Sequence, residues 1–296
     1  MLKRWIAALL ALMLLALPAL AEMAEGNEPV DAERMLPGWI PENRPAFVDL
    51  DGDGIQEVVS WRYAPGEYEE SLLVTVGSAD GTAATCRTDI LWDEQVYIRD
   101  LDGDGAQEIL LSGDVMSADY VTYCLRYTGG ALAELLFPDS GRGDENGDGY
   151  YKCGYGAITA IDGNRLVLSG SQDILGTWFA TRAVTLTPLC RFEFDDDGIW
   201  VRDGADLSDA GLWEYAALTL RTSVAYYGAG GSPNGVLSPG DRIIPYASDK
   251  RDRVWFATPD GIRGVLSISH DYERGWGWLV EGRSEEELFE YVPYAD

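Results

Sequence analysis

Short apolar runs recur along the chain and are separated by turns rich in glycine, proline and aspartate. Runs of four to eight residues bounded by such turns are typical of β-strands rather than helices. The pattern predicts strands at 71–76, 86–92, 120–127, 131–137, 157–161, 165–169, 178–186 and 189–194. Asp162-Gly163-Asn164 is a strong hairpin turn between two of them. The expected fold class is therefore all-β.

A nine-residue motif occurs twice in the first half of the chain. Residues Asp49–Glu57 read DLDGDGIQE, and Asp100–Glu108 read DLDGDGAQE, about 50 residues later. Apolar stretches flank both copies, and each copy continues into further strand-like runs. A fixed period of this length, with several strands in each unit, indicates a repeat architecture. A third, degenerate copy begins at Asp144 and spans 144–149.

The motif has the chemistry of a calcium loop. Carboxylates at its first, third, fifth and ninth positions can converge on one point, while the glycines at positions four and six tolerate positive φ. The seventh residue can add a carbonyl oxygen, and calcium takes six to eight oxygen ligands. An EF-hand would need an acid at position twelve, where Ser60 and Leu111 stand instead. The candidate metal ligands are Asp49, Asp51, Asp53, Ile55 and Glu57 in the first loop, and Asp100, Asp102, Asp104, Ala106 and Glu108 in the second.

The two loops resemble the calcium loops of FG-GAP and VCBS-type repeats, as found in the integrin α-subunit propeller and in bacterial secreted proteins. The resemblance covers roughly residues 40–200 and implies β-propeller-like units that each hold one calcium, through the ten residues named above. The third copy departs from the pattern, because Lys152 stands at its ninth position. Three units are too few for a closed propeller. The expected architecture is an incomplete propeller or a stack with an open edge.

Charge and composition exclude several classes of protein. The 296 residues carry a formal net charge of −28, which excludes a nucleic-acid binder and opposes adhesion to anionic membranes. An apolar fraction of 46% excludes a disordered acidic chain. Residues 1–21 have the charged start, short apolar middle and small-residue end of a signal peptide. The apolar run is short for a membrane span, and no second long apolar stretch follows. The protein is expected to be secreted, with 22–39 as a linker.

Residues 206–296 are expected to form a separate domain after the repeats of 40–205. The excess of acids is much smaller in this part, and short strand-like runs are separated by turns. Their order resembles bacterial Src-homology-3-like barrels, which many wall-associated proteins carry, although Gly264-Val265-Leu266 lacks the aromatic residue usual in the last turn. A short helix is expected to begin after Ser284 and to be held to the barrel by Leu288, Phe289 and Val292.

The four cysteines, Cys86, Cys124, Cys153 and Cys190, leave two alternatives open: two disulfides or buried thiols. Two functions also remain. The favoured one is a secreted, calcium-binding and non-enzymatic module that binds an extracellular protein or a cell-wall glycan at the cell surface. The alternative is a secreted hydrolase, such as a glycosidase, that uses an Asp/Glu pair.

The signal peptide gives the first testable prediction. Because Ala19-Leu20-Ala21 follows the apolar run, we expect the exported chain to begin at Glu22. N-terminal sequencing of the protein recovered outside the cell would check this. A chain that starts at Met1 and sediments with membranes would contradict it.

Overall fold

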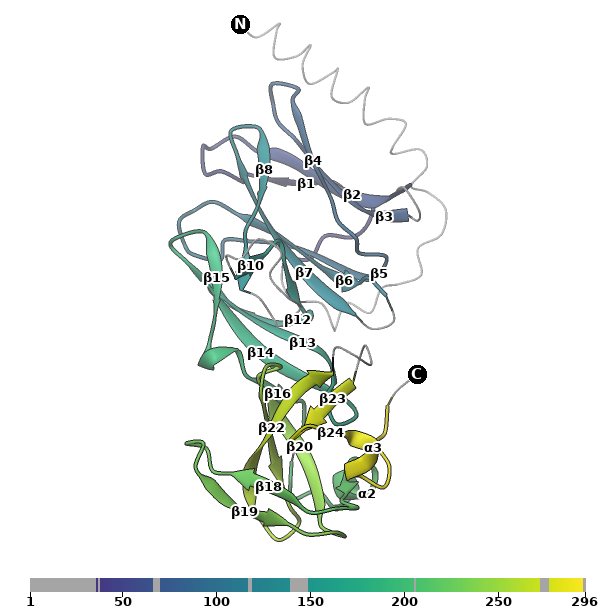
Figure 1. Ribbon diagram of the computed structural model, residues 1–296. Coiled ribbons are helices and arrows are strands. Elements are labelled where there is room, and N and C mark those ends of the chain that lie inside the picture. Colours follow the sequence, from purple (N-terminus) through teal and green to yellow (C-terminus); the bar gives the residue numbers. More distant parts are fainter. Residues whose placement is uncertain are drawn as a thin grey trace, which may run out of the picture.

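The computed structural model describes residues 36, 38–65, 70–116, 119–138, 149–204, 206–271 and 277–294. Within these residues the chain is mostly antiparallel β-sheet, and none of its sheets closes on itself (Figure 1). This confirms the all-β class. The predicted signal peptide at 1–21, most of the linker at 22–39, and positions 144–148 of the third loop lie outside the described residues.

The first two repeats form two four-stranded meanders. One consists of β1 (Ala46–Val48), β2 (Glu57–Pro65), β3 (Glu70–Gly77) and β4 (Ala83–Arg87), and the other of β5 (Trp92–Arg99), β6 (Glu108–Asp114), β7 (Tyr120–Thr128) and β8 (Ala131–Glu134). In each meander the acidic motif joins the first strand to the second.

The strand predicted at 86–92 is wrong, because the chain leaves the first sheet in this stretch. The N–H of Thr88 still donates to the Leu72 carbonyl of the first meander (3.0 Å), whereas the N–H of Leu91 donates to Asp114 of the second (2.9 Å). Ile90, between them, is fully buried. The apolar run therefore marks a buried crossing between two sheets and not one continuous strand.

A third meander follows three short strands. The short strands are β9 (Phe137–Pro138), β10 (Tyr150–Tyr151) and β11 (Cys153–Tyr155); the meander consists of β12 (Ala157–Asp162), β13 (Arg165–Asp173), β14 (Thr177–Thr187) and β15 (Arg191–Phe194). The predicted hairpin is confirmed: Asp162 pairs with Arg165, and Gly163 has a φ of 55°. These four strands match the four predicted between 157 and 194.

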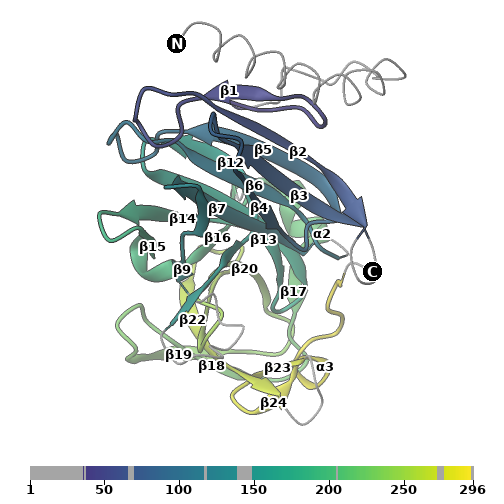
Figure 2. The same cartoon turned by 90° about the horizontal axis from the view of Figure 1, so that it is seen from above.

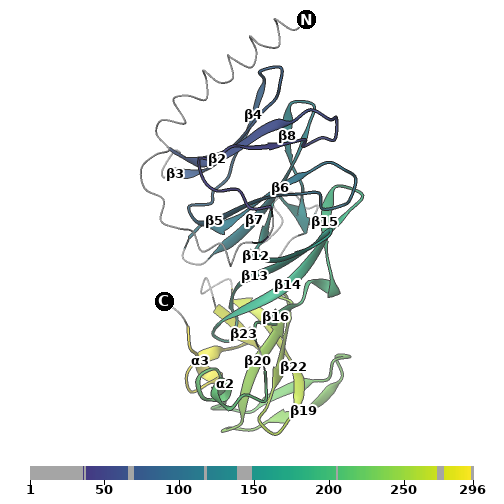
Figure 3. The ribbon, with the colours of Figure 1, turned by 180° about the vertical axis from the view of Figure 1, so that it is seen from behind.

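The three meanders are stacked face to face, with a core on each side of the middle one (Figures 1 and 3). Strand β6 shows why. Ile109 and Leu111 lie in the core shared with the first meander, whereas Leu110 lies in the core shared with the third. Because successive side chains point to opposite faces, a strand buried on both faces needs a continuous apolar run. Strand β2, in the end meander, instead alternates buried and more exposed positions.

The C-terminal part continues the sheet of the third meander. Its elements are η2 (Asp196–Gly198), β16 (Trp200–Arg202), α2 (Ala210–Tyr215), β17 (Leu218–Thr219), β18 (Val224–Tyr227), β19 (Pro233–Leu237), β20 (Arg242–Ser248), β21 (Arg253–Ala257), β22 (Arg263–Asp271), β23 (Gly277–Val280), β24 (Arg283–Ser284) and α3 (Glu285–Leu288). Strand β16 pairs with β14 on one side and with β20 on the other. The two parts are therefore joined by strand pairing across residue 205, and Figure 2 shows β16 next to β20, while the domain boundary there stays a prediction. Within the described residues, no helix has the length and apolar character to cross a membrane.

The expected helix after Ser284 is present as α3. The N–H of Ser284 donates to the Glu287 carboxylate (3.0 Å), and Leu288 and Phe289 are buried in the C-terminal core with Val292 packed against it. Glu285, at the start of α3, is also buried. Its carboxylate accepts hydrogen bonds from the Leu175 N–H (2.8 Å) and from the Tyr294 hydroxyl, and so joins α3 to the third meander.

Glu285 gives a prediction about pH. Burial raises the pKa of Glu285 above 4.5, although the two hydrogen bonds lower it in part. The folded chain thus holds this proton more tightly than the unfolded chain, so the associated stability is complete below pH 4.5 and is lost as the pH rises through the raised pKa. We expect Glu285→Gln to raise the unfolding midpoint at pH 7, with a gain that shrinks towards pH 4. The exposed Glu286→Gln controls for the loss of one charge, and an equal gain from both variants would contradict the assignment.

Candidate metal centre

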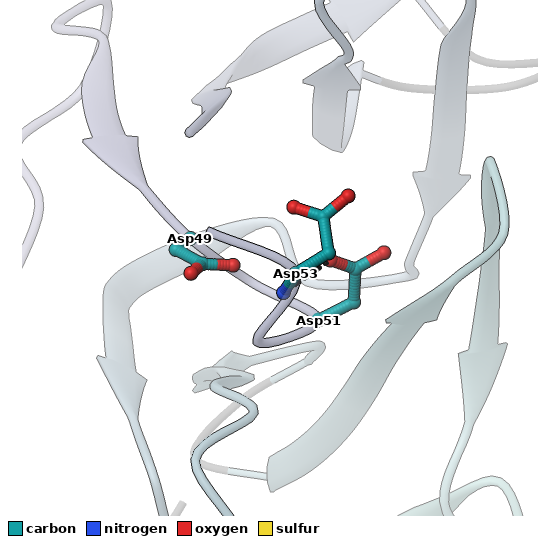
Figure 4. A group of neighbouring side chains, drawn as sticks. All are labelled: Asp49, Asp51 and Asp53. Atoms are coloured by element: carbon teal, nitrogen blue, oxygen red, sulfur yellow. Dashed lines mark hydrogen bonds between the residues drawn. The ribbon is translucent and has the colours of Figure 1, made fainter. Parts of the chain in front are cut away.

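The first acidic loop brings three carboxylates together between β1 and β2. Asp49, Asp51 and Asp53 each offer an oxygen, and these atoms lie within 4.8 Å of one another (Figure 4). The loop is closed from within, because the Gly54 N–H donates to Asp49 Oδ2 (2.8 Å) and the Ile55 N–H donates to Asp53 Oδ1 (2.7 Å). All three predicted aspartates therefore meet at one place.

The ninth residue of the motif anchors the loop to its strands. Glu57 is 3% exposed, and its Oε2 accepts the Leu50 N–H at 2.9 Å. The second loop repeats this bond, because Glu108 is fully buried and accepts the Leu101 N–H at the same distance. A buried glutamate thus fixes the second residue of each loop, which explains why the acid stands at position nine.

The second loop has the backbone of the first. Its glycines, Gly103 and Gly105, have φ of 76° and 93°, close to the 74° and 85° of Gly52 and Gly54. L-residues with a side chain rarely adopt this conformation, so the motif requires glycine at both positions. The N–H of Ala106 donates to Asp104 Oδ1 (2.8 Å), as the N–H of Ile55 does to Asp53. That the carbonyls of Ile55 and Ala106 bind a metal stays a prediction.

The two loops lie against each other. The Gln107 N–H of the second loop donates to the Leu50 carbonyl of the first (2.8 Å). A Cβ added to Gly52 would come within 3.5 Å of the Gly105 carbonyl oxygen. Loops that are about 50 residues apart in sequence therefore form one acidic edge of the stacked meanders.

The charges of the first loop are not balanced by the described chain. No lysine or arginine among the described residues forms an ion pair with its four carboxylates. Asp49 Oδ1 is buried and has no hydrogen-bond partner. Burial raises the pKa of Glu57; the Leu50 N–H lowers it in part, and the charges of the three aspartates raise it further. An unpartnered buried oxygen among like charges fits a hard cation with oxygen ligands.

The second loop contains a positive charge that belongs to the chain. Arg126 on β7 stands opposite Glu108 in the β6–β7 ladder. Its guanidinium donates to Asp102 Oδ2 (2.9 Å), to Asp104 Oδ2 (3.4 Å) and, through Nε, to Glu108 Oε1 (2.8 Å). A further nitrogen of Arg126 also bonds Glu108.

The pKa values of the second loop reflect this arginine. Burial would raise the pKa of Asp102, but the hydrogen bond and charge of Arg126 hold it below its ordinary value. Burial opposes the charge of Arg126, yet Asp102 and Glu108 raise the pKa of the guanidinium. Burial also raises the pKa of Glu108, and the bonds from Leu101 and Arg126 offset this only in part. Asp100, Asp102 and Glu108 form the second group whose oxygens lie within 4.8 Å of one another.

Sequence reasoning missed Arg126. The strand register could have identified it. The second and third strands of each repeat form a hairpin, and counting outward from its turn, one residue on each strand at a time, gives the residue opposite the ninth position of the loop. In the second repeat this count gives Arg126. Continued by one residue past the end of β3, the same count gives Ser78 in the first repeat.

The third loop and the cysteines complete the candidate residues. Asp144, Asn146 and Asp148 lie outside the described residues, and Lys152 pairs with Glu134 at 3.0 Å. None of the four cysteines forms a disulfide within the described residues, and Cys124 is buried whereas Cys190 is exposed. Cys190 fits neither expected alternative, a disulfide or a buried thiol. Its sulfur accepts a hydrogen bond from Arg126 (3.5 Å).

Comparison with known proteins gives no further assignment. No protein-family model, no curated protein and no solved structure matches the chain. The function is therefore inferred from the geometry and charge of the two loops.

Proposed function

We propose that the protein is a secreted, non-enzymatic binding module whose repeats are stabilised by calcium. The observation that carries the proposal is the first loop. Three aspartate oxygens lie within 4.8 Å of one another, a buried oxygen of Asp49 has no partner, and no basic side chain of the described residues pairs with the loop. Calcium would be held by Asp49, Asp51, Asp53 and Glu57 with the carbonyl of Ile55.

Calcium suits this loop better than magnesium. The donors are all oxygens on a glycine-containing turn, and calcium accepts six to eight such ligands in variable geometry, whereas magnesium demands near-ideal octahedral geometry and keeps several of its waters. The ion would supply the positive charge that the carboxylates lack. Because the loop joins β1 to β2 and touches the second loop through Leu50, fixing it would hold the first meander on the stack.

The proposed partner is an extracellular protein or a cell-wall glycan. The resemblance of residues 40–200 to FG-GAP and VCBS repeats, and of 206–296 to bacterial Src-homology-3-like domains, supports a propeller-like binding region joined to a wall-associated barrel. The hydrolase alternative would need an Asp/Glu pair about 5–10 Å apart; the two groups of three acids in the described residues are instead the loops, whose close spacing suits a metal. We therefore place the protein outside the cell, at the surface or wall.

Calcium should raise the thermal stability. Extracellular calcium modules bind at roughly 10⁻⁴ to 10⁻³ M. A site at the tight end would contribute about 1.5 kcal/mol at 1–2 mM calcium, which corresponds to a rise of about 3–6 °C in the unfolding midpoint. Melting curves in excess chelator and in millimolar calcium would measure this rise. Magnesium at the same concentration should give a smaller one.

Asp51→Asn tests whether the first loop is the site. The substitution preserves the shape of the side chain but removes a ligand charge, so the calcium-dependent rise should be lost. Asp162→Asn is the matched control, because it removes one charge from the exposed hairpin between β12 and β13 and should preserve the rise. A rise of the same size in both variants, or none in the unaltered protein, would refute calcium binding at the first loop.

A further inference from the structure

The two loops have nearly the same sequence but different surroundings at one position. In the second repeat, the ladder places Arg126 opposite Glu108. In the first repeat, the register pairs Val58 with Gly77, so continuing it by one residue beyond β3 brings Ser78 opposite Glu57. The Ser78 hydroxyl donates to Asp80 at 2.5 Å, within its own turn, and so brings no charge to the first loop.

Arg126 uses the oxygens that a metal would need. Asp102 and Glu108 are two of the three acids that form the second close group, and both bond the guanidinium. Asp104 is the third acid that Arg126 contacts. A divalent cation among these carboxylates would lie beside a fixed positive charge, and at distances of a few ångströms like charges repel strongly. Calcium could enter only if these bonds of Arg126 were broken.

We propose that Arg126 is a built-in counter-ion, so that the second loop is held by the chain itself and the protein binds one calcium ion, at the first loop. The inference rests on the proposed function, because it assigns the ion to one of two loops. The sequence alone predicts two equivalent sites. The residue opposite the ninth position of each loop decides which loop binds calcium. Ser78 leaves the first loop open to the ion, and Arg126 keeps the ion out of the second.

The arrangement makes the two repeats respond differently to calcium. The second loop belongs to the middle meander, which is buried on both faces, and is held by its ion pairs with Arg126 without calcium. The first loop belongs to an end meander and depends on the ion. Removal of calcium should therefore loosen β1–β4 while β5–β8 keep their structure.

Exchanging the two residues tests the proposal. Bound calcium would be counted by equilibrium dialysis and metal analysis, using the full chain. We expect one ion per chain for the unaltered protein, two for Arg126→Ser and none for Ser78→Arg. The double variant should again bind one ion, now in the second loop, so that adding Asp102→Asn abolishes binding whereas adding Asp51→Asn leaves it.

Stability separates a metal effect from damage to the fold. Arg126→Ser leaves buried Glu108 without its ion-pair partner, so this variant should melt at a lower temperature in chelator, and calcium should restore the loss. Arg165→Ser is the control, because it removes an arginine paired with Asp195 (2.7 Å) far along the chain and should leave one bound ion.

The outcomes distinguish the two proposals. Two ions in the unaltered protein, with no change in Arg126→Ser, would overturn the role of Arg126 and keep calcium binding. No ion in any of the proteins would overturn calcium binding itself. An Arg126→Ser variant that is destabilised, binds one ion and gains no more from calcium than the unaltered protein would show that Arg126 is only structural.

Discussion

Each acidic loop places four carboxylates within nine residues, and this charge must be balanced for the turn to remain compact. Like charges a few ångströms apart repel by several kcal/mol unless water or a cation screens them, and water has little access to a buried glutamate. The second loop is balanced in part by Arg126, which reaches three of its four carboxylates from the neighbouring strand. The first loop has no such partner among the described residues. Two copies of one motif thus meet the same constraint in different ways.

Because the sheets are stacked, the two acidic loops lie together at one edge of the molecule. Strand β6 contributes Leu110 to one core and Ile109 and Leu111 to the other, so the middle meander cannot shift without disturbing both. The bond between Gln107 and Leu50 then joins the loops directly. A cation at the first loop would therefore act on a position that is already held by the second. Adjacent sites of this kind are expected to be energetically coupled.

Much of the fold could be predicted from the sequence, because its strands are short and their turns are marked by glycine and aspartate. The hairpin at Asp162 and the helix after Ser284 are clear examples. The run at 86–92 misled because a buried crossing and a strand have the same apolar pattern. The loop residues were found from the motif alone, whereas Arg126 could be found only from the register of β6 and β7, which depends on the length of a hairpin rather than on any motif.

The bond from Leu175 to Glu285 has a consequence for the order of folding. It joins residues that are 110 positions apart, whereas the strands within each meander pair with near neighbours in the chain. Local pairings close small loops and form early, while contacts between distant residues carry a larger loss of chain entropy. The meanders are expected to form first, each from its own hairpins. Helix α3 can dock only after most of the chain is in place, so it closes the structure last.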